Sequence, residues 1–383
     1  MAALNIVKYL SPPMPNVTPD YDGLEYRWRF LTFRPAYFKN EVYFIGAAVL
    51  YLTFYFIGKK TNARRANKWF EAHLPLYQAQ FSRPANAEGL VSDGNSDFFA
   101  FSTGRRALAS LHTTFTLRPR HDLLQIAYQF VRGIVELDYI VQDKVDLEFT
   151  FRESVGKEGA VPEAVWAIVS KEEMKRLRND RWDLTFTKTT ENNALPSSLV
   201  VMSEFADITT NLLKPYGQFQ LVQVLSQPAI QPYFLSLSLT DQPRVRPSVP
   251  LEPSERHKRL VLSLSLPSGS DAAATLPLVA ATFQLVDVIS GEGKLPGVRG
   301  GLNAALRPET RSKLRKARED VEKQLREDAQ REKKEEEEEE KAAARKKARD
   351  ERVSKLSAAE QQKVLEREKK RLLRKSQGKV KAR

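Results

Sequence analysis

Cysteine is absent from this chain of 383 residues, and histidine occurs only four times. Without cysteine there can be no disulfide framework, no cysteine-ligated zinc or iron–sulfur site and no cysteine nucleophile. The histidines, at positions 73, 112, 121 and 257, never have the spacing of a helical metal-ligand pair. The glycine cluster at 291–301 fits neither the dinucleotide-binding nor the phosphate-loop spacing. The sequence therefore predicts no enzyme, and no catalytic, metal-binding or cofactor-binding residue.

An excess of positive charge is confined to the end of the chain. The formal net charge is +13, and hydrophobic residues make up 42% of the sequence, which is enough for a folded core. Residues 341–383 contain 17 Lys/Arg and 5 Asp/Glu, whereas residues 1–340 contain 44 and 43. Because the larger part is almost neutral, any argument from basicity concerns the tail alone.

One long apolar run lies near the N-terminus. Residues 42–58 contain no charged residue, and aromatic side chains lie near both ends of the run, where membrane interfaces favour them. As a helix the run is about 25 Å long, close to the hydrocarbon thickness of about 27 Å of the ER membrane. We predict a transmembrane helix at 41–58, with a buried core helix as the alternative. Residues 1–20 lack the apolar region of a signal peptide, so a removable one is not expected.

Two features predict that the N-terminus is lumenal and the C-terminus cytosolic. Counting positive charges does not decide, because four precede the run within residues 26–40 and five follow it within residues 59–73. The one N-x-[ST] sequon, Asn16–Thr18, precedes the run, and no cysteine follows it, which suits a cytosolic domain. We therefore expect a single-pass membrane protein in which residues 1–40 form a short lumenal arm.

Residues 59–298 are predicted to form a cytosolic globular domain. Period-two alternation, typical of half-buried strands, occurs in three segments: 145–151, 235–240 and 260–266. Apolar residues at helical spacing predict helices in 121–132 and 198–213, and residues 273–290 are nearly all apolar, which predicts a well-buried helix there. A loop with four prolines, 243–253, separates the last two strands. Because strands and helices alternate without repeated βαβ spacing, the predicted fold class is α+β with a mostly antiparallel sheet.

Residues 299–383 are predicted to be a hinge followed by a long charged helical tail. The clustered glycines at 291–301 supply the hinge. In the tail, opposite charges four residues apart, such as Glu337 and Lys341, stabilise a solvated helix, whereas apolar residues are too sparse for a sustained heptad seam. The capping-box spacing at Ser357–Glu360 predicts a second helix after a break near Ser354.

The last seventeen residues hold the strongest functional signal. They contain one acid and nine basic residues: Arg367, Lys369, Lys370, Arg371, Arg374, Lys375, Lys379, Lys381 and Arg383. Such a cluster suits nucleic-acid phosphates, anionic lipid headgroups or acidic protein, or is a solvated helix without a partner. RNA is favoured over lipid because the cluster lies about 300 residues from the apolar run and lacks aromatic residues for interfacial insertion. The same lack predicts contact with phosphates rather than bases.

Several motifs resemble the coiled-coil domain-containing ER membrane proteins also called calumin, the subunits that partner Asterix in the PAT complex. The similarity runs from about residue 40 to the end of the chain, and Leu195–Glu204 is its most specific segment. The other segments are Asn62–His73, His121–Gln125, Arg259–Ser270 and the charged tail ending in Lys379–Arg383.

The resemblance implies a non-enzymatic ER membrane protein that binds translating ribosomes at the translocon and assists the insertion and folding of multi-pass membrane proteins. The implied partners are ribosomal RNA near the tunnel exit, an Asterix-type small membrane subunit, the Sec translocon with other multi-pass translocon subunits, nascent multi-pass proteins and membrane lipid. Animal members carry a long acidic lumenal arm linked to calcium. Residues 1–40 contain only three acids, so lumenal calcium binding is not expected here.

Two alternatives stay open at this point. In the first, the chain is a membrane tether whose basic tail binds anionic lipid on another membrane. In the second, it is a membrane-bound enzyme with an unrecognised site in the globular domain, which would require a pocket with convergent polar groups of perturbed pKa.

Overall fold

The computed structural model describes residues 23–28, 31–35, 41–86, 89–136, 139–152, 159–216, 219–252, 255–292 and 300–354. Its α-helices are α2 (Glu41–Gln80), α3 (Leu123–Val135), α4 (Lys171–Asp180), α5 (Ala206–Leu213), α6 (Leu221–Leu225), α7 (Leu276–Ser290), α8 (Gly301–Ala305) and α9 (Pro308–Ser354). The short 3₁₀ helices that lie wholly within the described residues include η2 (Asp183–Phe186), η3 (Gln231–Tyr233) and η5 (Ala272–Thr275). Its strands are β1 (Tyr26–Trp28), β2 (Leu31–Phe33), β3 (Val91–Ser92), β4 (Asp97–Ser102), β5 (Leu108–Thr116), β6 (Lys144–Phe151), β7 (Trp166–Ser170), β8 (Lys188–Thr190), β9 (Leu199–Ser203), β10 (Phe234–Thr240) and β11 (Arg259–Ser265).

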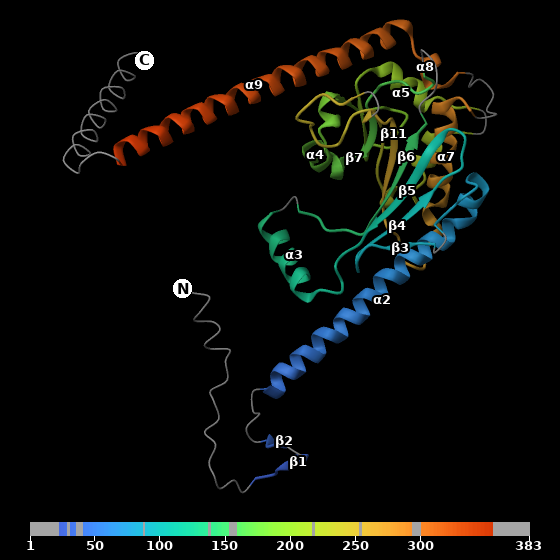
Figure 1. The fold of residues 1–383 in the computed structure, drawn as a ribbon. Coiled ribbons are helices and arrows are strands. Elements are labelled where there is room, and N and C mark those ends of the chain that lie inside the picture. The colour runs from blue at the N-terminus through green and yellow to red at the C-terminus, as the bar shows by residue number, and fades with distance from the viewer. Residues whose placement is uncertain are drawn as a thin grey trace. The chain divides into compact units, whose positions relative to one another are not determined.

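The described residues form two compact units. The first comprises the residues up to Val245 together with Arg256–Ser312, and the second comprises Arg246–Glu255 with the helix α9 from Lys313 onward. The first unit contains the sheet and the helices from α2 to α8 (Figure 1).

The centre of the first unit is a nine-stranded sheet with the order β3-β4-β5-β6-β11-β10-β7-β9-β8. Every pairing in it is antiparallel. Around the middle, Phe149 of β6 pairs with Leu111 on one side and with Leu260 on the other. The predicted α+β class with a mostly antiparallel sheet is confirmed, and the three predicted strands correspond to β6, β10 and β11.

One predicted helix is wrong in its first half. The segment 198–213 is not one helix, because Leu199–Ser203 forms the strand β9 and the helix α5 begins only at Ala206. All five residues of β9 are buried, and β9 pairs with both β7 and β8. A short continuous apolar run does not distinguish a buried strand from a buried helix, and the adjacent valines Val200 and Val201 favour the strand.

One face of the sheet is covered by the second half of α2 and by α7 (Figure 1). The ring of Phe283 on α7 packs edge-on against Tyr77 of α2 and Phe149 of β6, with centroid distances of 5.6 and 5.4 Å. The predicted buried helix at 273–290 is confirmed as η5 and α7. Although the 19 residues of η5 and α7 are apolar enough to cross a membrane, 61% of their apolar window is buried, as in a core helix.

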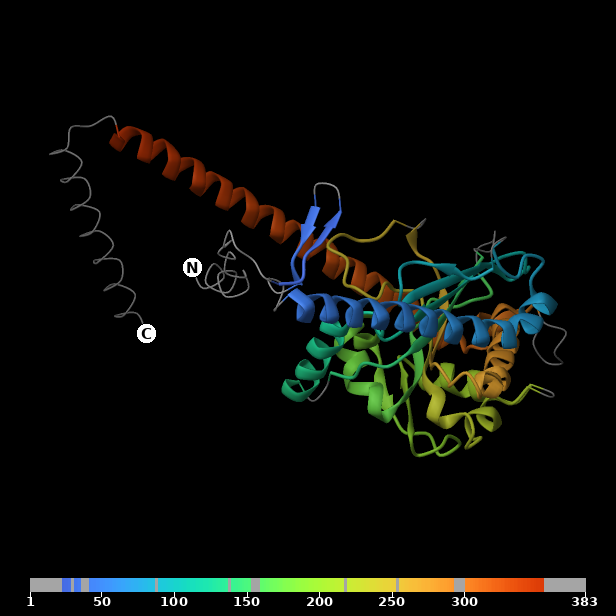
Figure 2. The same ribbon diagram turned by 90° about the horizontal axis from the view of Figure 1, so that it is seen from below.

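The helix α2 combines an exposed apolar half with a packed half. Its apolar window is only 6% buried, and the helix is long and apolar enough to cross a membrane, as predicted for 42–58. The helix then continues without a break to Gln80 (Figures 1 and 2). The buried residues of the second half recur at helical spacing and form a single stripe: Gly58, Asn62, Ala66, Trp69, Phe70, His73 and Tyr77. One helix therefore joins the apolar run to the core.

The glycines at 291–301 include two that pack tightly. Gly291 ends α7 with a φ of 71° and Gly301 starts α8 with a φ of 74°, a region that favours glycine. A Cβ at Gly301 would lie 2.7 Å from the carbonyl oxygens of Ala160 and Ile289. Residues 293–299 of the predicted hinge lie outside the described residues, so the hinge and the boundary at 298 stay predictions.

The second unit consists of the proline-rich segment Arg246–Glu255 and of α9 from Lys313 onward. Arg246 of this segment forms an ion pair with Asp328 of α9. The predicted charge pairs four residues apart are present at Glu322–Arg326 and Glu337–Lys341, and α9 remains helical through the acidic run Glu335–Glu340. The second tail helix predicted from Ser357 lies outside the described residues.

Candidate functional site in the long helix and the charged tail

The packed half of α2 begins at Gly58, where the segment before α3 touches the helix. A Cβ at this position would lie 2.1 Å from the carbonyl oxygen of Arg120. That distance is shorter than any van der Waals contact, so a larger residue would push the two elements apart. Glycine therefore permits the segment around Arg120 to lie directly against the end of the apolar run.

Asn62, one turn further along α2, is a fully buried polar residue. Its side-chain amide donates hydrogen bonds to the carbonyl oxygens of Asn95 (3.1 Å) and Arg118 (3.0 Å). Its side-chain oxygen accepts a hydrogen bond from the Arg120 guanidinium at 3.0 Å. A buried amide is tolerated here because its donors and its acceptor have partners.

The carboxylate of Asp143, immediately before β6, binds the positively charged side chains around this contact. Its carboxylate accepts two hydrogen bonds from the Arg120 guanidinium, at 2.8 and 2.7 Å, and one from the backbone N–H of Arg118 at 2.9 Å. Arg65 of α2 forms an ion pair with the same carboxylate at 3.0 Å. Burial alone would raise the pKa of Asp143, but these donors hold the pKa below its usual range. The ionised carboxylate therefore joins α2 to the sheet.

A second polar cluster lies deeper in the core, where the rings of Trp69 and His73 stack with centroids 3.8 Å apart. His73 Nδ1 donates to the Trp69 carbonyl oxygen at 2.8 Å, which leaves Nε2 to accept from the Thr275 hydroxyl at 3.1 Å. The same hydroxyl oxygen accepts a hydrogen bond from the Trp69 indole N–H at 2.9 Å. Burial lowers the pKa of His73 to about 4, although its hydrogen bonds act in the opposite direction.

We expect stability to fall with acid because of His73. Above pH about 6.5 the imidazole is neutral in both the folded and the unfolded state. Between pH 6.5 and 4 only the unfolded state binds the proton, so the free energy of unfolding should be about 2 kcal/mol lower at pH 5 than at pH 7.5. Urea unfolding of the solubilised protein at both pH values measures this difference. His73→Phe should remove most of it, whereas replacing the exposed His257 with glutamine should not. An unchanged pH dependence in His73→Phe would contradict the assignment.

The opposite face of the sheet carries a groove of about 880 Å³ beside α4. Side chains of both charges line it, among them Lys144, Asp146, Glu173 and Arg176. Glu173 accepts a hydrogen bond from Gln142 at 2.9 Å and forms an ion pair with Arg176, so it is engaged in local structure. Across the part of the chain that the structure describes, there is no group of three or more His, Cys, Asp or Glu residues that could hold a metal ion.

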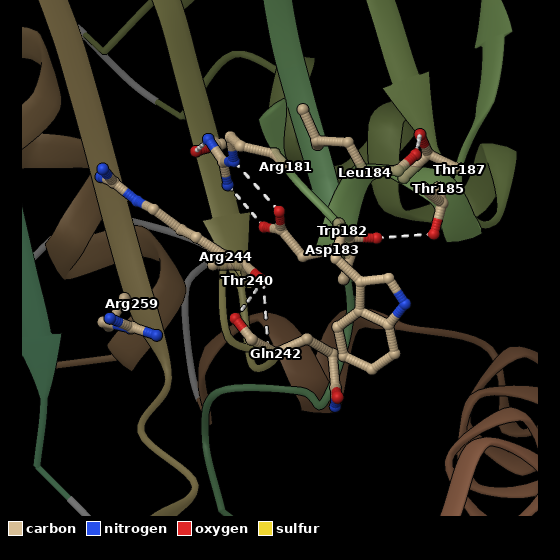
Figure 3. Close-up of polar contacts among 12 residues, drawn as sticks. Arg181, Trp182, Asp183, Leu184, Thr185, Thr187, Thr240, Gln242, Arg244 and Arg259 are labelled. Atoms are coloured by element: carbon tan, nitrogen blue, oxygen red, sulfur yellow. Dashed lines mark hydrogen bonds and ion pairs between the residues drawn. The ribbon is translucent and has the colours of Figure 1, made fainter. Parts of the chain in front are cut away.

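Beside this groove, a buried ion pair fixes the end of α4 (Figure 3). The Arg181 guanidinium donates to both carboxylate oxygens of Asp183, at 3.0 and 2.5 Å, and to the Ser238 hydroxyl of β10 at 2.8 Å. The backbone N–H of Trp182 donates to the Arg244 carbonyl oxygen at 2.7 Å. Arg181 and Asp183 are thus held by each other, and Arg181 also by the strand β10.

The nine basic residues predicted to contact ribosomal RNA lie outside the described residues, from Arg367 to Arg383. Their role stays a prediction. The contacts of Asn62 and Asp143 were not predicted from the sequence. One feature of the sequence could have indicated buried polar contacts: Asn62 and His73 stand on an otherwise apolar helical stripe.

The family model of PAT complex subunit CCDC47 matches residues 37–375, which is most of the chain. The chain belongs to this family. The resemblance stated from the motifs is thereby confirmed. In the structure, Asn62, the first residue of one segment that carried the resemblance, contacts Arg120, the residue immediately before another such segment.

Relatives of the CCDC47 family are similar over about two thirds of this chain. A UPF0674 endoplasmic reticulum membrane protein of Schizosaccharomyces pombe is 28% identical over 265 residues, 63% of this chain and 68% of that protein. PAT complex subunit CCDC47 of Danio rerio is 24% identical over 286 residues, and that of Homo sapiens is 23% identical over 284 residues. These alignments cover 67% and 66% of this chain but only 55% of each vertebrate protein.

Proposed function

We propose that this chain is a non-enzymatic, single-pass ER membrane protein that binds translating ribosomes at the translocon and assists the insertion and folding of multi-pass membrane proteins as a PAT complex subunit. Membership of the CCDC47 family over residues 37–375 carries the proposal. The almost wholly unburied apolar half of α2 supports the membrane anchor. The N-terminus is proposed to be lumenal and the C-terminus cytosolic.

Each part of the chain has a physical task in this proposal. The span of α2 holds the body at the membrane, beside an Asterix-type small subunit, the Sec translocon and nascent multi-pass proteins. The nine basic residues of the tail meet the phosphates of ribosomal RNA near the tunnel exit. If the tail neutralises about 6–10 phosphates, affinity falls about 10³- to 10⁵-fold between 50 and 200 mM salt. Tethering to the membrane then sustains binding by raising the effective concentration.

Co-sedimentation of the solubilised protein with ribosomes over a salt series tests this proposal. We expect the full-length chain to bind, with affinity falling steeply as salt rises, and a variant ending at Glu340 to lose most of that binding. A full-length variant with the nine basic residues replaced by glutamine should behave like the truncated variant. Replacing Glu335–Glu340 by glutamine serves as the control, because it changes tail charge and keeps the basic cluster.

Two outcomes would contradict parts of the proposal. If truncation leaves binding unchanged, the contact lies in the body and the tail is only a spacer. If neither the full-length nor the truncated chain binds ribosomes, the ribosome-binding function is wrong. The remaining candidate is then a tether whose tail binds anionic lipid, which predicts binding to acidic liposomes that RNA does not displace.

A further inference from the structure

The helix α3 is apolar but almost wholly exposed on the surface of the body. The prediction of a helix at 121–132 is confirmed, but its apolar side chains do not enter the core. None of the thirteen residues of Leu123–Val135 is buried. Its large side chains are widely exposed: Leu124 by 75%, Phe130 by 70%, Ile134 by 65% and Val135 by 77%. A contiguous apolar surface of this kind marks an interaction site.

The polar residues of α3 form one narrow stripe. Gln125, Gln129 and Arg132 follow one another at helical spacing, and Glu136 caps the C-terminus. The guanidinium of Arg132 donates to Glu136 at 2.9 Å and lies 4.5 Å from the ring centroid of Tyr139, so the one charge within the helix is paired. The rest of the helix surface is apolar. At about 20 Å the helix is too short to cross a bilayer and has the length of an interfacial segment.

The start of α3 is fastened to the end of the apolar run of α2. The His121 ring, one residue before the N-cap Asp122, lies 6.0 Å from the Tyr55 ring of α2. The carbonyl oxygen of Arg120 lies against Gly58. Tyr55 is three residues before Gly58, about 4.5 Å along the helix axis. The N-terminus of α3 therefore lies level with the end of the apolar run of α2. In both ribbon views α3 lies nearer to the first half of α2 than to its far end (Figures 1 and 2).

The two ends of the segment that carries α3 are held together at the sheet. The helix lies in the long connection between β5 and β6, referred to below as the excursion. The two ends of this connection are held together by the hydrogen bond from the Arg118 N–H to Asp143 at 2.9 Å. The Asp122 carboxylate accepts hydrogen bonds from the N–H groups of Leu124 and Gln125, which defines the helix start. The excursion therefore leaves the sheet at the point where α2 enters the body.

We propose that α3 lies in the headgroup–acyl boundary of the phospholipid leaflet from which α2 emerges. This rests on the proposed membrane anchoring of α2. Lipid is the partner that the structure favours, because the exposed apolar surface of α3 begins at the same level as the lipid-facing end of the apolar run of α2. Tyr128 and Phe130 supply the aromatic rings that membrane interfaces favour. The body is then attached to the membrane through two elements, a spanning helix and an interfacial one.

The absence of cysteine permits a direct test with single-cysteine variants. The full-length chain carrying Phe130→Cys, labelled with the fluorophore NBD, is reconstituted into phosphatidylcholine vesicles. Quenching by dibrominated phosphatidylcholine reports lipid contact, and quenching by iodide reports water. Val49→Cys in the apolar run of α2 is the lipid control, and Val245→Cys, at a position 77% exposed, is the water control. We expect the label at 130 to resemble that at 49, with several-fold stronger lipid quenching than at 245.

The outcomes separate this inference from the proposed anchor. If the label at 49 contacts lipid while those at 130 and, in a second variant, Ile134→Cys behave like the label at 245, α3 does not bind lipid and the inference is overturned. If the label at 49 also reports water, the anchoring of α2 is wrong as well. If the label at 130 becomes protected only when another protein is added, α3 is a protein-binding surface and the lipid inference is overturned.

Discussion

Replacement of Asp183 by alanine is expected to lower the free energy of unfolding by about 3–5 kcal/mol. Asp183 is fully buried, and its partner Arg181 is only 7% exposed at its side chain. Removing the carboxylate leaves a buried guanidinium that still donates a hydrogen bond to the Ser238 hydroxyl but has lost its anionic partner. An unpaired buried charge is far more costly than a lost surface ion pair.

Urea unfolding of the solubilised protein measures this effect, and a double-mutant cycle identifies its cause. Arg181→Met combined with Asp183→Ala should cost clearly less than the sum of the two single changes, because no charge is left unpaired. Thr185→Ala serves as the control, since Thr185 is an exposed residue of the same 3₁₀ helix, and it should change stability by at most about 0.5 kcal/mol. If the loss of unfolding free energy in the double variant equals the sum of the losses in the two single variants, the view that the ion pair acts as a unit is contradicted.

Asp143→Ala is expected to destabilise the protein by about 2–3 kcal/mol. The change leaves Arg120 and Arg65 without their shared carboxylate and removes the acceptor of the Arg118 N–H. The expected loss is smaller than for Asp183 because the two arginine side chains are 24% and 27% exposed, so water screens the unpaired charges.

The effect of Asp143→Ala should also reach α3. Because Asp143 holds both ends of the excursion, its loss should weaken the lipid quenching of the label at position 130 while leaving the label at 49 unchanged. Asp146→Ala on the neighbouring strand β6 is the matched control, since Asp146 has no part in this network. If Asp143→Ala costs no more stability than Asp146→Ala, the view that Asp143 fastens α2 to the sheet is contradicted.

Local pattern was sufficient for much of the fold. The strand β6 could be predicted because its side chains alternate strictly between the core and the partly exposed face. The apolar run of α2 could be predicted because seventeen residues lack any charge. The strand β9 could not, because it is buried on both faces and so has no alternation to detect.

The remaining features depend on contacts between distant residues. Asp143 lies 78 residues from Arg65, and nothing in either local sequence indicates that they meet. The amphipathic pattern of α3 predicts the helix but is the same whether the apolar face is covered by a sheet or by lipid. The tail residues predicted for RNA were chosen by charge density alone, which does not depend on a fold.

The continuity of α2 has a mechanical consequence. Forty residues in one helix make a rod about 60 Å long, and no joint separates the apolar half from the half that is packed into the core. The packed half, from Gly58 to Gln80, extends about 35 Å, so a 10° tilt of the apolar half would displace the far end of the helix by about 6 Å. The body moves with it, since the contacts of Asn62 and Asp143 clamp the rod to the sheet. A neighbouring helix that packs against the apolar half, or leaves it, can change the tilt of α2. Because α2 is rigid and bound to the sheet, that change of tilt moves the entire sheet.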